Sequence, residues 1–192
     1  EVPRMGGGFG GKESQATQPA CWAALGAWAT GQACRVRFSR HQDMAWTGKR
    51  HPFLGRYSAG FTNGKLVALK TDIYCNGGWS EDLSIPILDR AMFHTDNAYF
   101  IQDLHFQGRA CRTNLPSNTA FRGFGGPQGV LVVEDAINRF AESQGLDPAQ
   151  VRADSFYQEH QPTPYGQVLK DVRLQRIWSE LSLSSGYTDR RD

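Results

Sequence analysis

The alternation of apolar and polar residues along the 192-residue chain predicts both strands and helices. The clearest signal is a pair of alternating runs, RYSAGFT and KLVALKTDIYCN, on either side of Asn63-Gly64. Asn-Gly between two such runs is a preferred turn of a tight β-hairpin, so a hairpin is expected here. The segment CRVRFSR, residues 34–40, alternates apolar and basic residues and predicts a half-buried strand.

Other stretches have the spacing of helices. Alanine-rich residues 13–30 predict a helix whose first turns Pro19 kinks or delays and which ends at Gly31. The run GVLVVEDAINRFAESQG predicts a second helix, which a glycine follows. DPAQVRADSFYQ predicts another, with Asp147 as N-cap and Pro148 at the first helical position. LKDVRLQRIWSELSLSSG predicts a further amphipathic helix near the end of the chain.

Residues 76–127 show weaker periodicity and predict a loop-rich region with short apolar pieces such as IPIL and AYFIQDL. No internal repeat or low-complexity linker interrupts the chain. The mixture of a hairpin, further strands and several helices indicates an α+β fold that carries its chemistry on loops.

Composition narrows the class of protein. Hydrophobic residues make up 40% and charged residues 21%, which is an ordinary globular mixture. A formal net charge of +2 gives no sign of a nucleic-acid-binding surface. No apolar run reaches the roughly 18 residues of a membrane-spanning helix. We therefore expect neither nucleic acid nor a membrane as partner.

The four cysteines, Cys21, Cys34, Cys75 and Cys111, are scattered along the chain. They form no Cys-x-x-Cys motif, and no histidine accompanies them at zinc-ligand spacing. The pattern predicts no metal bound directly by the protein. It favours a cytoplasmic protein with reduced, mostly buried thiols.

Two glycine-rich segments stand out. The first glycine loop, residues 4–13, reads RMGGGFGGKE, and the second glycine loop, residues 114–129, reads NLPSNTAFRGFGGPQG. Free backbone N–H groups in such loops can cradle an anion, and each loop leads into a predicted helix. The pair favours one long anionic ligand contacted from two sides. The ordinary alternative is that each loop is only a flexible turn.

The first glycine loop also contains G-x-G-x-x-G, formed by Gly6, Gly8 and Gly11, with Asp43 as a possible acidic partner. That motif indicates a dinucleotide site only directly after a strand of a βαβ unit. Here only EVPRM precedes it, and Pro3 interrupts any strand. Nicotinamide binding therefore stays as a weaker alternative.

The two glycine loops, together with RHPFLGRYSAGFTNGKLVAL and LDRAMFHTDNAYFI between them, resemble the molybdenum-cofactor-binding part of the xanthine dehydrogenase and xanthine oxidase family. The resemblance covers nearly the whole chain. It implies that residues 1–192 are a fragment of the molybdopterin-binding domain, incomplete at both ends. It also implies that a pterin dithiolene holds the molybdenum, with or without an appended cytosine dinucleotide.

The same resemblance implies that 2Fe-2S clusters and FAD lie in other domains or subunits, and that the complete enzyme is a homodimer of protomers. It implies oxidation of hypoxanthine and xanthine to urate, with electrons passed to the iron–sulfur and flavin centres. The base glutamate of the family and a glutamine-containing cofactor loop are expected outside this chain. The chain alone is therefore expected to be inactive.

Site residues follow from the resemblance position by position. Arg122 is implied to contact the cofactor through its backbone, and Phe124 to lie against the substrate. Glu13 and Arg90 match a polar pair that grips a purine, which makes them the catalytic candidates. The cofactor-binding candidates are Gly8, Phe9, Gly10 and Arg122, with Phe9 nearest the molybdenum.

Each of these positions has an ordinary structural interpretation as well. Arg90 can form a surface ion pair with Asp89 or Glu81, and Glu13 can be a first-turn helix carboxylate. Within the family, aldehyde or N-heterocycle oxidases are the alternative, because they have apolar or altered residues at the positions of Glu13 and Arg90. A further alternative is a non-catalytic fragment that binds no cofactor.

Overall fold

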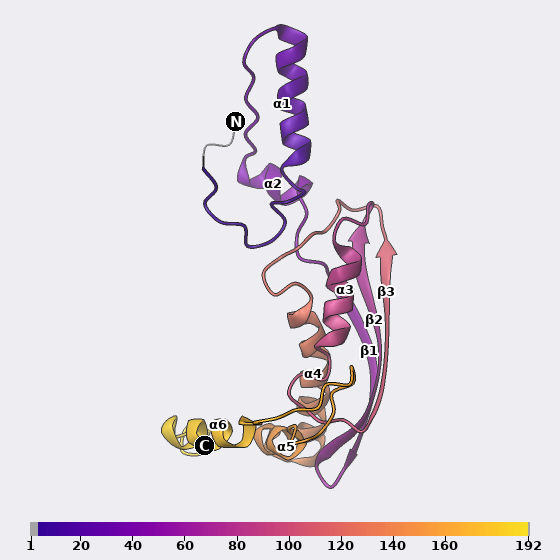
Figure 1. Cartoon of the computed structure of the whole chain (residues 1–192), viewed down its shortest axis with the longest axis vertical. Helices are drawn as coiled ribbons and strands as arrows, with labels where there is room; N and C mark the ends of the chain where they lie inside the picture. The colour runs from indigo at the N-terminus through magenta and orange to yellow at the C-terminus, as the bar shows by residue number, and fades with distance from the viewer. Residues whose placement is uncertain (1–3, 192) are drawn as a thin grey trace. The chain divides into compact units, whose positions relative to one another are not determined.

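The computed structural model describes residues 4–191, which form helices and a small sheet (Figure 1). In chain order the elements are α1 (Thr17–Thr30), α2 (Arg40–Trp46), β1 (Phe53–Thr62), β2 (Lys65–Gly78), α3 (Ser84–Phe93), β3 (Asp103–Arg112), α4 (Gly126–Gln144), α5 (Pro148–Ser155) and α6 (Leu174–Ser184).

The chain divides into two compact units, and each is assembled from three stretches of sequence. The first unit contains the N-terminal part through Leu54, Ile73–Met92 and Gly108–Gln128. The second unit contains Gly55–Asp72, Phe93–Gln107 and Gly129–Asp192. The first glycine loop, residues 114–128 of the second and every candidate site residue belong to the first unit.

The sheet has the strand order β1-β2-β3. Asn63 and Gly64 join β1 to β2 with positive φ angles of 51° and 80°, so the predicted hairpin is confirmed. The arrowheads of β2 and β3 lie at the same end of the sheet, so these two strands run parallel (Figure 1). The parallel pair requires a crossover, which α3 supplies. This mixed sheet with its helices confirms the expected α+β class.

Each unit has its own apolar core. In the first unit, Ile73 and Cys75 of β2 are buried together with Leu88 of α3, and Phe53 and Met92 pack against them. This packing fixes the inner face of α3 and leaves Arg90 exposed in its last turn. The second unit has the larger core, made by Leu66, Leu69, Tyr99, Ile101, Val133, Ile137, Ala141, Val151 and Phe156.

Several helix predictions are confirmed. Asp147 caps α5 by accepting a hydrogen bond from the Ala149 N–H at 2.8 Å, and Pro148 is its first residue. The helix expected from Gln128 begins slightly earlier, at Gly126, and Gly145 follows its end with a φ of 63°. The amphipathic helix near the end of the chain is α6.

The helix expected from Glu13 begins later, at Thr17, as the position of Pro19 suggested. The residues before Thr17 form turns because their side chains make tertiary contacts instead. Ser14 Oγ and Gln15 Nε2 donate hydrogen bonds to Asp82 Oδ2 at 3.1 and 3.2 Å. Gly31 ends the helix with a φ of 67°, as predicted.

The strand predicted for residues 34–40 is wrong. Residues 33–39 are not part of a strand, and Arg40 begins α2. Ser39 caps α2 in a capping box with Gln42, a stable alternative to continuing the alternation. A half-buried strand needs a partner, and none in the described part of the chain pairs with this segment.

Two other expectations need correction. Residues 76–127 contain α3 and β3, so the region is less loop-rich than predicted. The thiols are not mostly buried: Cys21 and Cys34 are exposed, Cys111 is half-buried and only Cys75 is buried. All four are free thiols.

Candidate functional site

The first glycine loop exposes its phenylalanine. Phe9 is 71% exposed and has a φ of 53°, a conformation that a non-glycine residue seldom adopts. Gly10 follows with a φ of 95°, and a Cβ at this position would lie 2.6 Å from the Ala120 carbonyl oxygen. Only glycine allows the backbone to approach that carbonyl so closely.

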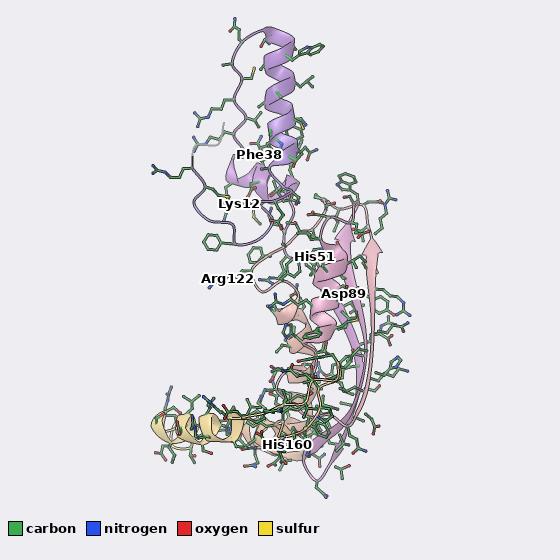
Figure 2. All side chains as sticks on the ribbon, viewed as in Figure 1. Lys12, Phe38, His51, Asp89, Arg122 and His160 are labelled. Atoms are coloured by element: carbon green, nitrogen blue, oxygen red, sulfur yellow. The ribbon has the colours of Figure 1, made fainter. Side chains whose placement is uncertain are left out.

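This contact brings the two glycine loops together, because Ala120 belongs to the second. The hydroxyls of Ser14 and Thr119 lie 3.5 Å apart and reinforce the junction. Gln15, which follows the first loop, is held to the segment before β1, since its Oε1 accepts a hydrogen bond of 2.5 Å from the Gly48 N–H. The two loops are therefore neighbours in space, and Figure 2 labels Lys12 on the first and Arg122 on the second.

The second glycine loop repeats the local geometry of the first. Phe124 has a φ of 48° and is half-buried, and Gly125 follows with a φ of 91°. A Cβ at Gly125 would overlap the carbonyl oxygen of Ile87 in α3. The loop is thus held against α3 by close backbone packing, directly before α4 begins.

A cleft of about 500 Å³ lies where the loops meet. Gly8, Gly10 and Lys12 line it from the first loop, and Thr119, Ala120 and Phe121 line it from the second. Lys49 also lines the cleft, and its Nζ donates to the Asp43 and Thr47 carbonyl oxygens at 2.7 and 2.9 Å. The cleft therefore combines bare backbone with cationic side chains.

The remaining candidates lie elsewhere in the first unit. Glu13 is exposed in the turn before α1, and Arg90 is exposed in the last turn of α3. Neither lines the 500 Å³ cleft, and neither do Phe124 and Arg122. The structure thus brings Gly8 and Gly10 to the second loop but does not gather all seven candidates around one cavity.

Phe124 lines a separate, narrow crevice, too small to hold a water molecule, which it shares with Arg50, His51 and Gln128. His51 is 2% exposed, and its Nε2 lies 2.8 Å from Ser84 Oγ at the start of α3. Burial lowers the pKa of His51, although the Asp82 carboxylate opposes that shift. A neutral imidazole here supports α3.

Arg50 was not a candidate from the sequence. Its Nη2 donates a hydrogen bond of 2.5 Å to the Arg122 carbonyl, and its guanidinium lies 4.5 Å from the centroid of the Phe121 ring. Its only sign in the sequence was the RHPF segment, which formed part of the family resemblance. A contact between residues 72 positions apart leaves no local sequence pattern.

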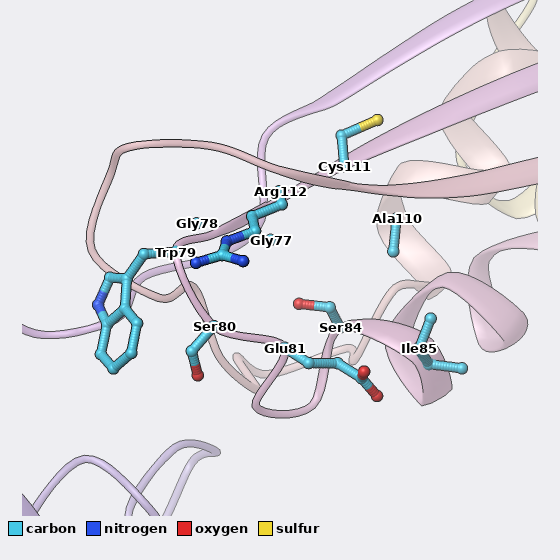
Figure 3. Close-up of a pocket in the computed structure, with 10 residues that line it drawn as sticks. All are labelled: Gly77, Gly78, Trp79, Ser80, Glu81, Ser84, Ile85, Ala110, Cys111 and Arg112. Atoms are coloured by element: carbon cyan, nitrogen blue, oxygen red, sulfur yellow. The ribbon is translucent and has the colours of Figure 1, made fainter.

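A third cavity, of about 330 Å³, lies beside the start of α3 (Figure 3). Arg112 reaches it from the end of β3, while Glu81 and Ser84 line its other side. Trp79 and Cys111 also line it, but Cys111 Sγ points away from the arginine (Figure 3). None of these residues was a candidate from the sequence.

Among residues 4–191, no cluster of three or more His, Cys, Asp or Glu side chains is arranged to hold a metal ion. Within the same residues, none of the helices has the length and apolar character needed to cross a membrane. The described structure begins at the first residue of the first glycine loop, so residues 1–3 of EVPRM lie outside it. No strand follows α1 before β1 in the described part of the chain, so the expected βαβ continuation of a nicotinamide site is not supported.

Comparisons with known proteins agree on one family. The model of the molybdopterin cofactor-binding domain matches residues 1–156. Xanthine dehydrogenase/oxidase of Mus musculus is 49% identical over 191 residues, or 99% of this chain, and xanthine dehydrogenase of Dictyostelium discoideum is 41% identical over the same length. The chain spans 14% of the length of each of these relatives.

A solved structure shows the same fold. The aldehyde oxidoreductase of Desulfovibrio desulfuricans ATCC 27774 superimposes with a TM-score of 0.81 and 28% identity. The match covers 97% of this chain and 20% of that one. The sequence match, the shared fold and the two adjoining glycine loops lead to one conclusion: the chain belongs to the molybdopterin cofactor-binding domain family.

Proposed function

We propose that this chain is the cofactor-contacting part of a molybdenum hydroxylase. The complete enzyme oxidises hypoxanthine and xanthine to urate. The observation that carries the proposal is identity of 41–49% to proteins named xanthine dehydrogenase, along 99% of the chain. The complete enzyme would pass electrons to 2Fe-2S and FAD centres in other domains or subunits and would form a homodimer. The unpaired cysteines favour a cytoplasmic location.

The cleft between the loops fits a molybdopterin. At Gly8, nothing lies within 4 Å of the place that a Cβ would occupy, so the backbone is open to a ligand. The volume of about 500 Å³ lies within the usual range for cofactor pockets, roughly 300–1,000 Å³. Lys12 places a cation at its edge, where the phosphate of the pterin would be stabilised.

Backbone groups of Gly8, Gly10 and Arg122 are the proposed contacts to the cofactor, with Phe9 beside the metal. When bound, the molybdenum centre supplies the two-electron oxidation that accompanies hydroxylation of an electron-poor carbon. The appended cytosine dinucleotide is not required by this proposal. The protein's own task is to hold both loops in place, for which the Gly10–Ala120 contact provides support.

The substrate side of the proposal rests on three side chains. Phe124 offers a flat ring against which a purine can stack, an interaction of about 1–3 kcal/mol for bases on aromatic rings. Oxidation at the purine carbon places negative charge on the ring, and the Arg90 guanidinium would stabilise that charge more than the ground state. Glu13 would orient the base by accepting a hydrogen bond from a ring N–H.

A second candidate is an aldehyde or N-heterocycle oxidase of the same family. The specific observation in its favour is the structural match to an aldehyde oxidoreductase with 28% identity. The two candidates differ at Glu13 and Arg90, because a site with charged groups rejects a ligand that leaves those groups unpaired. Such a pair favours a purine over a simple aldehyde.

The test is Arg90→Met in the complete, cofactor-loaded enzyme, assayed with xanthine and with benzaldehyde. Xanthine turnover should fall roughly a hundredfold or more, because one lost charge stabiliser typically costs about 2.7–4 kcal/mol of barrier. Benzaldehyde turnover should survive. Arg176→Met, at an exposed helical arginine of α6, is the matched control.

Equal activity of wild type and Arg90→Met towards xanthine would show that Arg90 is structural and would remove the main support for a purine substrate. The proposed inactivity of the isolated chain is tested separately by metal analysis. A loaded site contains about one molybdenum per chain, while a chain that cannot bind the cofactor contains none.

A further inference from the structure

Arg50 lies directly before His51 and reaches the second glycine loop with two different kinds of contact. Its Nη2 donates a hydrogen bond of 2.5 Å to the carbonyl oxygen of Arg122. Its Cζ lies over the Phe121 ring, 4.5 Å from the centroid and within the range of cation–π attraction. One side chain thus holds two consecutive residues of the loop.

The other terminal nitrogen decides what kind of role Arg50 has. Nη1 is buried and has no hydrogen-bond partner among residues 4–191. The narrow crevice that Arg50 lines together with Phe124 has no space for a water molecule. A ligand therefore cannot reach Nη1 in this conformation, so Arg50 does not bind one directly. Its effect must pass through the loop.

The loop needs such support because its backbone is unusual. Gly123, Phe124 and Gly125 are three consecutive residues with positive φ, of 98°, 48° and 91°. Turn hydrogen bonds from the Phe124 N–H to Phe121 at 2.8 Å and from the Gly126 N–H to Gly123 at 3.0 Å are local. The direction of the Phe124 ring therefore depends on how the preceding residues are anchored.

We propose that Arg50 is a positioning residue, whose guanidinium anchors Phe121 and Arg122 and so sets the direction of the Phe124 ring and of the Arg122 backbone. The inference rests on the proposed function, in which that ring carries the substrate. Lysine cannot replace Arg50. An ammonium group lacks the planar guanidinium that hydrogen-bonds the Arg122 carbonyl while contacting the face of the Phe121 ring.

If Arg50 only stabilised the fold, its removal would mainly lower the melting temperature. A positioning role predicts little change in stability. A buried N–H without an acceptor is unfavourable, so removing the guanidinium relieves one cost while losing one hydrogen bond. Arg50→Met should consequently change the melting temperature little. Loss of loop order at nearly unchanged stability is the signature of a positioning residue.

The experiment compares the complete enzyme with its Arg50→Met and Arg50→Lys variants, with Arg37→Met, at an exposed arginine, as the control. Amide hydrogen exchange of residues 121–125 is measured first, because it requires neither cofactor nor substrate. Exchange should be at least tenfold faster in both Arg50 variants and unchanged in the control. Molybdenum content, KM and kcat for xanthine follow.

In the Arg50 variants, KM for xanthine should rise at least fivefold, by more than kcat falls, since the displaced ring contributes to binding. Unchanged exchange in residues 121–125 would overturn the proposal. Faster exchange with unaltered xanthine kinetics would support the anchoring role and would overturn the purine site instead. Phe121→Leu removes the cation–π contact alone and should give a smaller change in the same direction. This variant keeps the proposal testable if the Arg50 variants fold poorly.

Discussion

At the scale of single residues, the two glycine loops use the same device. In each, a phenylalanine with positive φ, Phe9 or Phe124, is followed by a glycine with positive φ. A phenylalanine in this conformation costs roughly 1–2 kcal/mol. Each following glycine packs on a carbonyl of another segment, so tertiary structure maintains the strained geometry.

Gly125→Ala should be strongly destabilising. The new methyl group would overlap the Ile87 carbonyl, and the φ of 91° is unfavourable for alanine. Together these effects should lower the free energy of unfolding by about 2–5 kcal/mol, measured by thermal or urea unfolding. Gly145→Ala, with a φ of 63° and nothing within 4 Å, is the control and should cost only about 1 kcal/mol. Equal losses would show that steric overlap is unimportant.

Asp96 provides a prediction about pH. Asp96 is 4% exposed and accepts a hydrogen bond of 2.6 Å from Tyr157, and burial raises its pKa despite that bond. A carboxyl whose pKa is higher in the folded state favours folding at low pH, and that contribution is lost as the pH rises through the unfolded and then the folded value. Asp96→Asn keeps an acceptor for Tyr157. It also removes the loss of stability that ionisation of the buried carboxyl causes at higher pH.

The asparagine variant should therefore be more stable than wild type at pH 7, as measured by urea unfolding. Its advantage should begin to shrink once the pH falls below the raised pKa and reach its minimum below about pH 4, the ordinary range of Asp. An advantage that is independent of pH would contradict the assigned cause.

At the scale of elements, Arg152 joins α5 to α4. Its Nε donates to Glu134 Oε2 at 2.8 Å and its Nη2 to Asn138 Oδ1 at 2.7 Å. Glu134 also accepts a hydrogen bond of 2.5 Å from Tyr99, and burial together with this interaction raises the Tyr99 pKa. The Arg152 and Glu134 side chains are only 19% and 23% exposed, so solvent screens the pair incompletely.

Arg152→Met should destabilise the chain by about 1–3 kcal/mol, since hydrogen bonds to charged groups contribute that much when partly buried. The exposed pair of Arg139 and Asp135 on α4 is the comparison, and Arg139→Met should cost less than about 1 kcal/mol. Double-mutant cycles with each acidic partner separate the pair energies. Similar coupling for both pairs would contradict the role of burial.

Sequence reasoning succeeded where the determinants are local. Asn63-Gly64 set the hairpin, and the Asp147-Pro148 pair set the start of α5, because a turn or a cap requires only neighbouring residues. It failed where a distant partner decides the structure. Residues 34–40 alternate like a strand but pair with none of the described strands. Pro86 weakened the helical pattern of α3. Gly108 and the charged residues near it weakened the strand pattern of β3.

The candidate site, too, could be predicted from the sequence only in part. The glycine-rich composition predicted that the loops share a ligand, and the contact of Gly10 with Ala120 shows that they adjoin. The anchoring of the second loop by Arg50 was invisible, because its partners are 72 residues away. The roles of Glu13 and Arg90 stay predictions until they are tested in the complete enzyme.

At the scale of the whole molecule, the four free thiols report on burial in different parts of the chain. Cys21 and Cys34 are exposed and should react with Ellman's reagent within minutes at pH 8. Burial and the neighbouring Cys111 raise the pKa of Cys75 to about 12, which leaves only about 0.01% of it as thiolate at that pH. Cys75 should react only after unfolding.

Mass spectrometry after brief labelling assigns each thiol. Replacing both exposed cysteines by serine should remove the fast phase and leave the slow one. Labelling of Cys75 as fast as Cys21 would show that the first unit opens readily in solution.

The junction of the glycine loops also has a consequence for how the chain folds. Ser14 and Thr119 meet across 105 residues, so this contact is among the least local in the first unit. Such contacts form slowly, because chain entropy opposes them until the intervening elements are in place. During synthesis at about 5–20 residues per second, the first loop would wait roughly 5–20 seconds before its support emerges. The cofactor cleft is therefore expected to be a late product of folding, and insertion of the cofactor must follow translation of the second loop.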